Sequence, residues 1–139
     1  MSARDELAAR QSGVVGELLR GRTPEGFDEL RSRHTGRILA MKRVDGMTHV
    51  RPEIALLPRW RDRAIAFVLA TPAGSCAHWD AEMFVEWVRD RPTADDGDWV
   101  VLDDLRAGRR RIATVEMATR RHLVWSRRGR LHALPALPN

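Results

Sequence analysis

The first half of the chain alternates between stretches with helical periodicity and short polar breaks. Apolar positions three and four residues apart predict an amphipathic helix over about residues 4–19 and a second one over about residues 27–44. The turn-rich stretch 21–26, with two glycines and a proline, separates them, and Asp45-Gly46 is expected to end the second helix. The expected buried faces are Leu7, Gln11, Val14, Val15 and Leu18 on the first helix and Phe27, Leu30, His34, Ile38 and Met41 on the second.

Further helical segments follow before residue 92. Pro52 favours the start of a short helix that ends near Leu57. A helix that stops before Thr71-Pro72 is predicted from four apolar side chains at helical spacing: Trp60, Ala64, Phe67 and Val68. Asp80 is a good N-cap for a helix over about residues 81–91, and its expected buried face is Met83, Phe84, Trp87 and Val88. Four or five helices joined by short loops predict an α-helical bundle.

The pattern changes after the polar stretch 91–97, which is the best candidate for a domain boundary. Trp99, Leu102 and Leu105 are spaced for a helix capped by Asp98 and closed by Gly108, although the run 99–102 also fits the start of a strand. Residues 112–117, 122–126 and 130–134 are expected to be extended, with Gly129 in the turn of a hairpin. We therefore expect an α+β protein with a helical bundle over residues 1–92 and a small β-containing domain over residues 93–139.

Composition supports one folded protein rather than a disordered or membrane-spanning one. Apolar residues make up 43% of the 139 residues, an ordinary value for a globular chain. No apolar run approaches the roughly 20 residues of a membrane span, and the first seven residues are charged where a secretory signal needs its apolar core. The single cysteine, Cys76, has no partner within the chain for a disulfide. We expect a soluble cytoplasmic protein.

The positive charge is concentrated in parts of the chain. The formal net charge is +5, and only one of the 24 basic residues is a lysine, Lys42. The net charge is +4 over residues 1–70, −4 over residues 71–97 and +5 over residues 98–139. A basic tail favours an acidic partner, either a nucleic acid, a peptide or a protein. A GC-rich genome, which favours arginine codons over lysine codons, explains the same arginine bias without any function.

Few residues have the spacing of a catalytic or metal site. Cys76 and His78 suggest a thiol–imidazole pair, but such partners normally come from separate elements, and His78 reads better as a loop residue beside Asp80. The five histidines are scattered, with His34 expected in the core and His122 able to meet His132 across the hairpin. No glycine-rich phosphate loop is present. We therefore expect no catalytic residues, no metal and no cofactor.

The arginine clusters of the tail are the remaining candidates for a binding site. One reading is a solubilising face with charged edges that prevent self-association. The other is a surface for an acidic extended peptide that adds as a strand while arginines pair with its carboxylates. Nucleic acid is the rival ligand, but the clusters lack interleaved aromatic residues. The candidate peptide-binding residues are Arg109, Arg111, Val115, Arg120, Leu123, Trp125, Arg127 and Arg128, with the strands around Val115 and Leu123–Trp125 expected to pair with the peptide.

Several short motifs within residues 8–90 resemble a family of small accessory proteins. These motifs are Ala9-Arg10-Gln11, Pro24-x-Gly26-Phe27-Asp28, Trp60-Arg61-x-x-Ala64-x-x-Phe67 and Thr71-Pro72, followed by Ser75, Asp80, Phe84 and Trp87-Val88. The family is related to proteins labelled as a DNA-binding domain and is encoded beside multinuclear non-haem iron-dependent oxidative enzymes. The resemblance implies a helical domain followed by a smaller β-containing domain.

The resemblance also implies a function. In that family the small protein is not the catalyst: it binds the leader of a ribosomally made precursor peptide and docks on the iron enzyme, a TIM-type barrel. The sequence therefore leads to the hypothesis of a non-catalytic partner protein that holds a reactive peptide near a metal site on another chain. The alternative is a small DNA-binding transcriptional regulator that uses the same arginines on phosphates.

Overall fold

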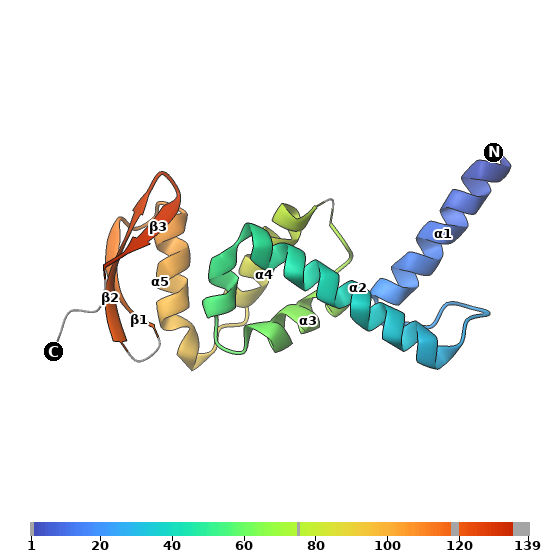
Figure 1. The fold of residues 1–139 in the computed structure, drawn as a ribbon, viewed down its shortest axis with the longest axis horizontal. Helices are drawn as coiled ribbons and strands as arrows, with labels where there is room; N and C mark the ends of the chain where they lie inside the picture. The colour runs from blue at the N-terminus through green and yellow to red at the C-terminus, as the bar shows by residue number, and fades with distance from the viewer. Residues whose placement is uncertain (1, 75, 118–119, 135–139) are drawn as a thin grey trace. The chain divides into compact units, whose positions relative to one another are not determined.

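The computed structural model describes residues 2–74, 76–117 and 120–134. Its contacts divide the chain into two compact units: the helical unit, up to Pro52 together with Arg59–Trp87, and the sheet unit, Glu53–Pro58 together with the chain from Val88 onward. The α+β class is confirmed, with helices first and a small antiparallel sheet at the C-terminal end (Figure 1). The domain boundary expected between residues 92 and 93 stays a prediction. No described helix is long and apolar enough to cross a membrane.

Four helices build the helical unit: α1 (Ala3–Leu19), α2 (Glu29–Val50), α3 (Trp60–Ala70) and α4 (Ala77–Arg89), whose last two residues belong to the sheet unit. Ser2 and Asp5 form a capping box at the start of α1, and the carboxylate of Asp28 caps α2. α2 continues through Asp45-Gly46, so the predicted end of this helix is wrong. A glycine inside a helix costs only about 1 kcal/mol, and here a Cβ on Gly46 would come within 3.3 Å of the Ala77 Cβ. Close packing between helices therefore outweighs the local helix-breaking tendency.

The core of the helical unit is aromatic at its centre. Phe67 of α3 meets Phe84 of α4 edge-on, with ring centroids 5.5 Å apart, and Trp87 stacks on Phe84 at 6.2 Å. The predicted helix at residues 60–70 and its apolar residues Ala64, Phe67 and Val68 are confirmed. The helical unit also buries Ala40, Val44 and Met47 of α2 and Ala81 and Val85 of α4.

The predicted buried face of α2 is wrong. Phe27 is 54% exposed, Leu30 is 76% exposed, and His34 is also exposed rather than in the core. The buried residues of α2 are instead Ser32, Gly36, Ala40, Val44 and Met47. A Cβ on Gly36 would lie 2.6 Å from the carbonyl oxygen of Leu18, so the end of α1 approaches α2 at a position that only glycine allows. Small side chains decide which face is buried, because they let the two backbones come close.

Most of the apolar stripe predicted for α1 is likewise exposed. Leu18 is buried near α2, whereas Leu7 is 56% exposed and Val15 is 45% exposed. The helix itself spans the predicted range, so its periodicity predicted a helix correctly and its burial wrongly.

Arg43 of α2 connects three segments of the helical unit through its guanidinium group. It binds the carboxylate of Asp80 with two bonds, Nε to Oδ2 at 3.0 Å and Nη2 to Oδ1 at 2.8 Å. It also donates to the carbonyl oxygens of Val68 and Thr71 at 2.9 and 3.0 Å, and to that of Pro72 at 3.3 Å. Asp80 was expected to cap its helix, but α4 begins earlier, at Ala77, and the buried carboxylate of Asp80 serves this ion pair instead.

The sheet unit begins with the 3₁₀ helix η1 (Pro52–Leu56), most of which belongs to it, and continues with η2 (Ala94–Asp96) and α5 (Gly97–Arg106). The run 99–102 is helical, and Trp99, Leu102 and Leu105 are buried as its helical spacing predicts. The residue at the N-cap of α5 is Asp96 rather than Asp98. Trp99 donates from Nε1 to the carbonyl oxygen of Glu53 at 2.9 Å, which ties η1 to α5.

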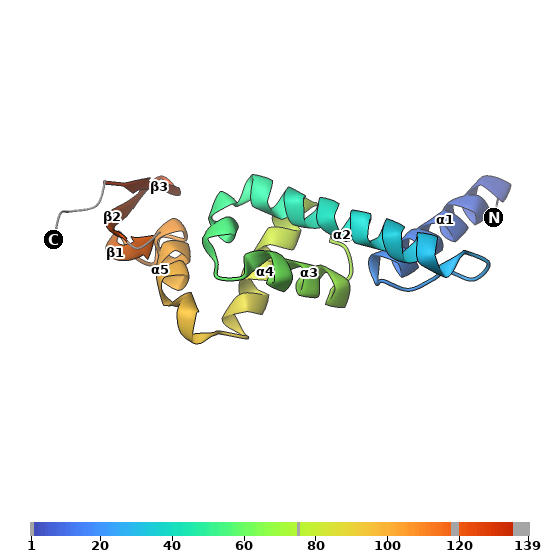
Figure 2. The ribbon, with the colours of Figure 1, turned by 60° about the horizontal axis from the view of Figure 1, so that its bottom comes forward.

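Three antiparallel strands, β1 (Ile112–Met117), β2 (Arg120–Arg127) and β3 (Arg130–Ala133), lie in the order β1-β2-β3. The predicted hairpin is confirmed: Arg128 and Gly129 both have positive φ values, 53° and 74°, as the tight turn between β2 and β3 requires. α5 packs against one face of the sheet (Figures 1 and 2). The core between them contains Leu102, Leu105, Val115 and Val124.

Candidate functional site

One face of the C-terminal sheet is left without a covering element among the described residues. Side chains of a strand alternate between the two faces, and Ala113, Val115, Met117, Val124 and Leu131 pack toward α5. The residues between them therefore share the opposite side, which we call the open face. The open face consists of Ile112, Thr114 and Glu116 of β1, Arg121, Leu123, Trp125 and Arg127 of β2, and Arg130, His132 and Leu134 of β3 and its end.

The centre of the open face is aromatic and apolar. Trp125 lies opposite His132, and the two rings stack with centroids 5.5 Å apart and planes 18° from parallel. Ile112 is the partner of Trp125 on the other neighbouring strand and is 56% exposed. A stacked aromatic pair bordered by exposed aliphatic side chains is a surface that loses water readily on contact with a ligand.

Arginines border this aromatic centre. Arg127 and Arg130 are direct partners across the β2–β3 hairpin, both exposed, and Arg121 lies further along β2 on the same face. Two like charges directly opposite each other are unfavourable in an isolated hairpin. The pair therefore has no stabilising value for the fold, and an acidic ligand would relieve the repulsion.

The two edges of the sheet differ in what they offer to an added strand. Ser126 N–H bonds the carbonyl oxygen of Arg111 at 3.2 Å, so alternation of the antiparallel ladder turns the backbone groups of Ile112, Thr114 and Glu116 outward. At this β1 edge the N–H of Glu116 already donates to the carboxylate of Asp98 at 3.0 Å. One N–H of the β1 edge is thus already hydrogen-bonded, and two acidic side chains lie there, Glu116 of β1 and Asp98 of α5.

The β3 edge has the opposite character. Leu134 N–H bonds the carbonyl oxygen of Leu123 at 3.0 Å, so the backbone groups of Leu131 and Ala133 point away from β2. The basic residues Arg128 and Arg130 lie at the start of this edge. An acidic strand is electrostatically favoured at β3 over β1.

The structure separates the predicted site residues into three groups: exposed and partly exposed residues of the sheet and its turns, the buried Val115, and the ion-paired Arg109. Arg111, Arg120, Arg127 and Arg128 are exposed, and Trp125 and Leu123 lie on the open face. Val115 is only 1% exposed, so its side chain is part of the core rather than of a binding surface. The expectation that Leu123–Trp125 pairs with a peptide does not fit, because β2 is the central strand and has β1 and β3 as neighbours on its two sides.

Arg109 is held by an ion-pair cluster in the sheet unit. Its guanidinium binds Asp103 at 2.7 Å and Asp104 at 2.8 Å. Arg89 binds the same two carboxylates, with 2.9 Å between its Nε and Asp103 Oδ2 and 2.6 Å between its Nη2 and Asp104 Oδ1. Burial by itself would raise the pKa of Asp104, but hydrogen bonds from Arg109 and Arg89 outweigh it and hold the pKa below its usual range. Burial would likewise lower the pKa of Arg89, and the same bonds to Asp103 and Asp104 raise it instead. Arg109 is therefore a structural residue.

The binding residues selected from the sequence did not include Arg121, Arg130 and His132, nor the outward-facing backbone of β3. The position of His132 could have been predicted from the register of a two-residue hairpin. With Arg128-Gly129 as the turn, Trp125 and His132 are cross-strand partners. The expected meeting of His122 and His132 is wrong for the same reason, because parity places them on opposite faces of the sheet.

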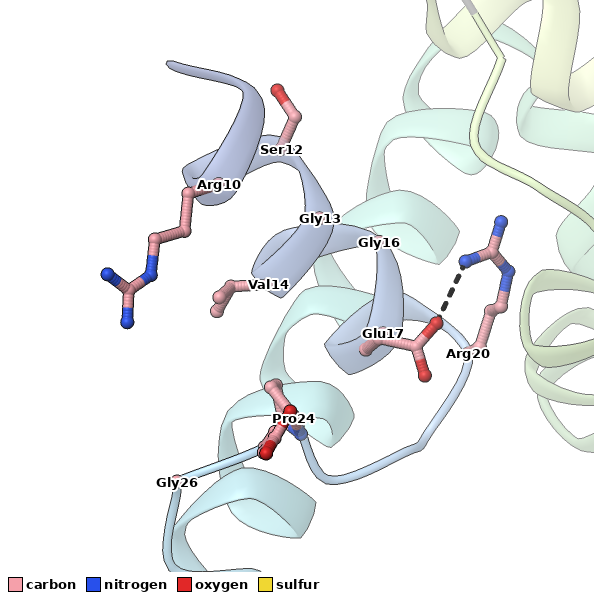
Figure 3. A pocket seen from close by; sticks show the side chains of 10 residues that line it. Arg10, Ser12, Gly13, Val14, Gly16, Glu17, Arg20, Pro24 and Gly26 are labelled. Atoms are coloured by element: carbon pink, nitrogen blue, oxygen red, sulfur yellow. Dashed lines mark hydrogen bonds and ion pairs between the residues drawn. The ribbon is translucent and has the colours of Figure 1, made fainter. Parts of the chain in front are cut away.

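The remaining candidates give no arrangement with evident chemistry. Cys76 and His78 are both exposed, His78 lying in the first turn of α4. An open hollow of about 930 Å³ lies between the second half of α1 and the loop at Pro24–Gly26, where Glu17 pairs with Arg20 at 3.2 Å (Figure 3). Within the described residues, no three His, Cys, Asp or Glu side chains are grouped as metal ligands.

A family model described as "SCO6045-like, C-terminal domain" matches residues 8–90. The chain belongs to this family. The match covers most of α1 and all of α2, α3 and α4 but not α5 or the sheet. No curated protein and no solved structure gives a match to the chain.

Proposed function

We propose that this protein is a non-catalytic partner protein that binds the acidic leader of a ribosomally synthesised precursor peptide on its C-terminal sheet. Its role is to bring the peptide to an iron-dependent modifying enzyme of the TIM-barrel type, so that the reactive part of the peptide is held at high local concentration beside a metal on that enzyme. The observation that carries the proposal is the open face together with the β3 edge, where backbone, aromatic and basic groups lie side by side.

The β3 edge supplies the mode of binding. An extended peptide adds to an exposed strand through main-chain hydrogen bonds, and alternate side chains of the peptide then face the two sides of the sheet. Side chains on the open side would contact Trp125 and His132, which gives the binding sequence dependence. Carboxylates on the same side would meet Arg127 and Arg130, which favours an acidic segment.

In the first experiment, leader peptides encoded next to the gene are titrated into the purified protein, and calorimetry measures their affinity. The double variant Arg127→Glu/Arg130→Glu should bind about five- to thirtyfold more weakly, because each of the two rim charge pairs contributes roughly 0.5–1 kcal/mol. The matched control is Arg4→Glu/Arg10→Glu, which makes the same change in net charge on exposed residues of α1 and should bind as the wild type does. A leader peptide that shows no binding at micromolar concentrations overturns the proposal.

A second pair of variants distinguishes the two sheet edges. Ala133→Pro removes an outward N–H from β3, and Thr114→Pro removes an outward N–H from β1, without removing a donor used in the β1–β2 or β2–β3 ladder. Loss of peptide binding in Ala133→Pro and its retention in Thr114→Pro are expected. If Thr114→Pro loses peptide binding and Ala133→Pro keeps it, the peptide binds at the β1 edge instead. If both variants keep peptide binding, the peptide does not bind by strand addition.

The alternative function, regulation through DNA binding, draws on the same basic residues. It predicts binding to an arbitrary 20-base-pair duplex with an affinity that falls steeply with salt, since phosphate contacts release counterions. Peptide binding through backbone bonds and apolar contacts should survive moderate salt. If the protein binds the duplex and does not bind a leader peptide, the result favours a DNA-binding regulator.

A further inference from the structure

α2 carries two apolar faces, and the described part of the chain covers only one of them. At about 100° per residue, Leu30, His34, Ile38 and Met41, with Phe27 just before the helix, lie within an arc of about 80°. The arc occupied by the buried residues Ser32, Gly36, Ala40, Val44 and Met47 is centred roughly 140° away on the same scale. We call the first set, the exposed Phe27, Leu30, His34 and Ile38 together with the partly buried Met41, the α2 stripe.

The α2 stripe is unusually exposed for apolar side chains of a regular helix. Leu30 is 76% exposed, Phe27 54% and Ile38 43%. A single exposed leucine is ordinary, but several in a row on one face mark a contact surface. The row covers about four turns, or roughly 21 Å at 1.5 Å per residue, which is the length of a docked helix.

One hollow lies on the α2 stripe and a second lies to its side. The first, an open hollow of about 570 Å³, is lined by Leu30 and His34 of the stripe and by the neighbouring Arg31 and Thr35. The second, an apolar hollow of about 350 Å³, lies between α2 and α3, where Met41 of the stripe, the flank residues Arg33 and Arg37, and Gly36 and Ala40 meet Ile65 and Leu69. Depressions spaced along a helix accept the projecting side chains of a second helix.

Basic side chains flank the α2 stripe on both sides. Arg31 and Lys42 lie on one side, and Arg33 and Arg37 on the other, all of them exposed. Arg33 pairs with Glu29 near the start of the helix, and Asp45 lies at the far end of the stripe. A partner therefore meets positive charge along most of both flanks.

We propose that the α2 stripe docks an amphipathic helix of a partner protein whose apolar face is bordered by carboxylates. The apolar side chains of that helix contact the α2 stripe and fill the hollow at Leu30 and His34, and its flanking Glu or Asp residues pair with Arg31, Arg37 and Lys42. A second copy of this chain is disfavoured as the occupant, because a two-fold pairing of α2 with α2 sets the same basic flanks against each other. The proposal concerns the helical unit and does not rest on peptide binding by the sheet unit.

The probe is an 18-residue synthetic helix with leucines at four positions of helical spacing and glutamates on both flanks. Its twin has lysines in place of the glutamates. In fluorescence anisotropy the glutamate helix should bind at least tenfold more tightly than the lysine helix. Chemical-shift changes in the labelled protein should fall on the residues of the α2 stripe and its flanks.

Two substitutions test the surface directly. Leu30→Asp/Ile38→Asp should weaken the glutamate helix at least tenfold, whereas the matched control Leu7→Asp/Val15→Asp, on exposed apolar residues of α1, should leave it unchanged. Arg31→Glu/Arg37→Glu should reverse the preference in favour of the lysine helix. Circular dichroism of each variant checks that its helices are intact, so that a lost fold is not mistaken for lost docking.

Three results would overturn the proposal. One is no binding of the glutamate helix at 200 μM, the concentration to be reached in the titration. Another is equal binding of the two helices, which would show that the basic flanks select nothing. The third is a concentration-dependent dimer in sedimentation that Leu30→Asp/Ile38→Asp abolishes, because the occupant is then a second copy of the chain. In each case leader binding to the sheet unit is measured separately, so failure here and failure of the proposed function are distinct.

Discussion

Each unit of the chain contains an arginine–aspartate cluster, and the two clusters differ in shielding and in redundancy. Arg43 and Asp80 of the helical unit have side chains only 10% and 8% exposed, and Arg43 also holds three carbonyl oxygens. In the sheet unit, Arg89 and Arg109, with side chains 33% and 52% exposed, both bind Asp103 and Asp104. We therefore expect the fold to depend on the buried Arg43–Asp80 pair, which no other residue can replace, and to tolerate the loss of one member of the shared, partly solvent-exposed cluster.

The largest expected effect is in the helical unit. Asp80→Ala leaves the guanidinium of Arg43 buried without its carboxylate and should lower the free energy of unfolding by about 3–5 kcal/mol. Urea denaturation followed by circular dichroism measures this loss. Asp80→Asn, which keeps the shape but not the charge, is the control and should lose less. A loss below about 1 kcal/mol for Asp80→Ala would mean that the Arg43–Asp80 pair contributes no more than an exposed ion pair. The two clusters would then not differ in their importance for the fold.

A smaller effect is expected from Asp104, and it depends on pH. Because the pKa of Asp104 in the folded protein lies below its ordinary value of 3.8, its ion pairs stabilise the fold above that pH and stop doing so as the pH falls below it. Asp104→Asn should therefore cost about 1 kcal/mol at pH 7 and progressively less as the pH is lowered from about 5 to 3. Urea unfolding of both proteins across this range gives the difference. A difference that does not shrink in acid would contradict the assignment.

The smallest effect is expected at Arg109. Arg109→Ala leaves Arg89 bound to both carboxylates, so the free energy of unfolding should fall by only about 0.5 kcal/mol. Leader binding should be unchanged, in contrast to Arg127→Glu/Arg130→Glu. Thermal unfolding and calorimetry on the same sample check both points. A loss of peptide affinity in Arg109→Ala would return this residue to the binding surface.

The helices and strands themselves were predictable from local patterns. Turn residues and apolar periodicity located the helix near Trp60 and the hairpin at Arg128-Gly129, because both depend on neighbours a few residues away. Asp80 was a capping candidate by the same local rules and proved to be an ion-pair partner of a residue 37 positions earlier. No local rule distinguishes these two uses of a carboxylate.

The candidate site was predictable only in part. The basic tail and the strands pointed to the sheet, but arginines look alike in sequence, and only the structure assigns Arg109 to an ion-pair cluster and Arg127 to the open face. The strand order was also decisive, because it makes β2 central and leaves β3 as the favourable edge.

The order of residues was enough to predict helices first and a hairpin-containing sheet last, and a positive charge carried almost entirely by arginines. Helical periodicity and turn chemistry depend on residues that are close together in the chain, so both can be recognised from the sequence. The buried apolar face of α2, in contrast, depends on packing between helices, since the close approach of α1 to Gly36 selects the face with small side chains. The side chains of Leu30 and Ile38, apolar enough for a core, thereby stay at the surface as the α2 stripe.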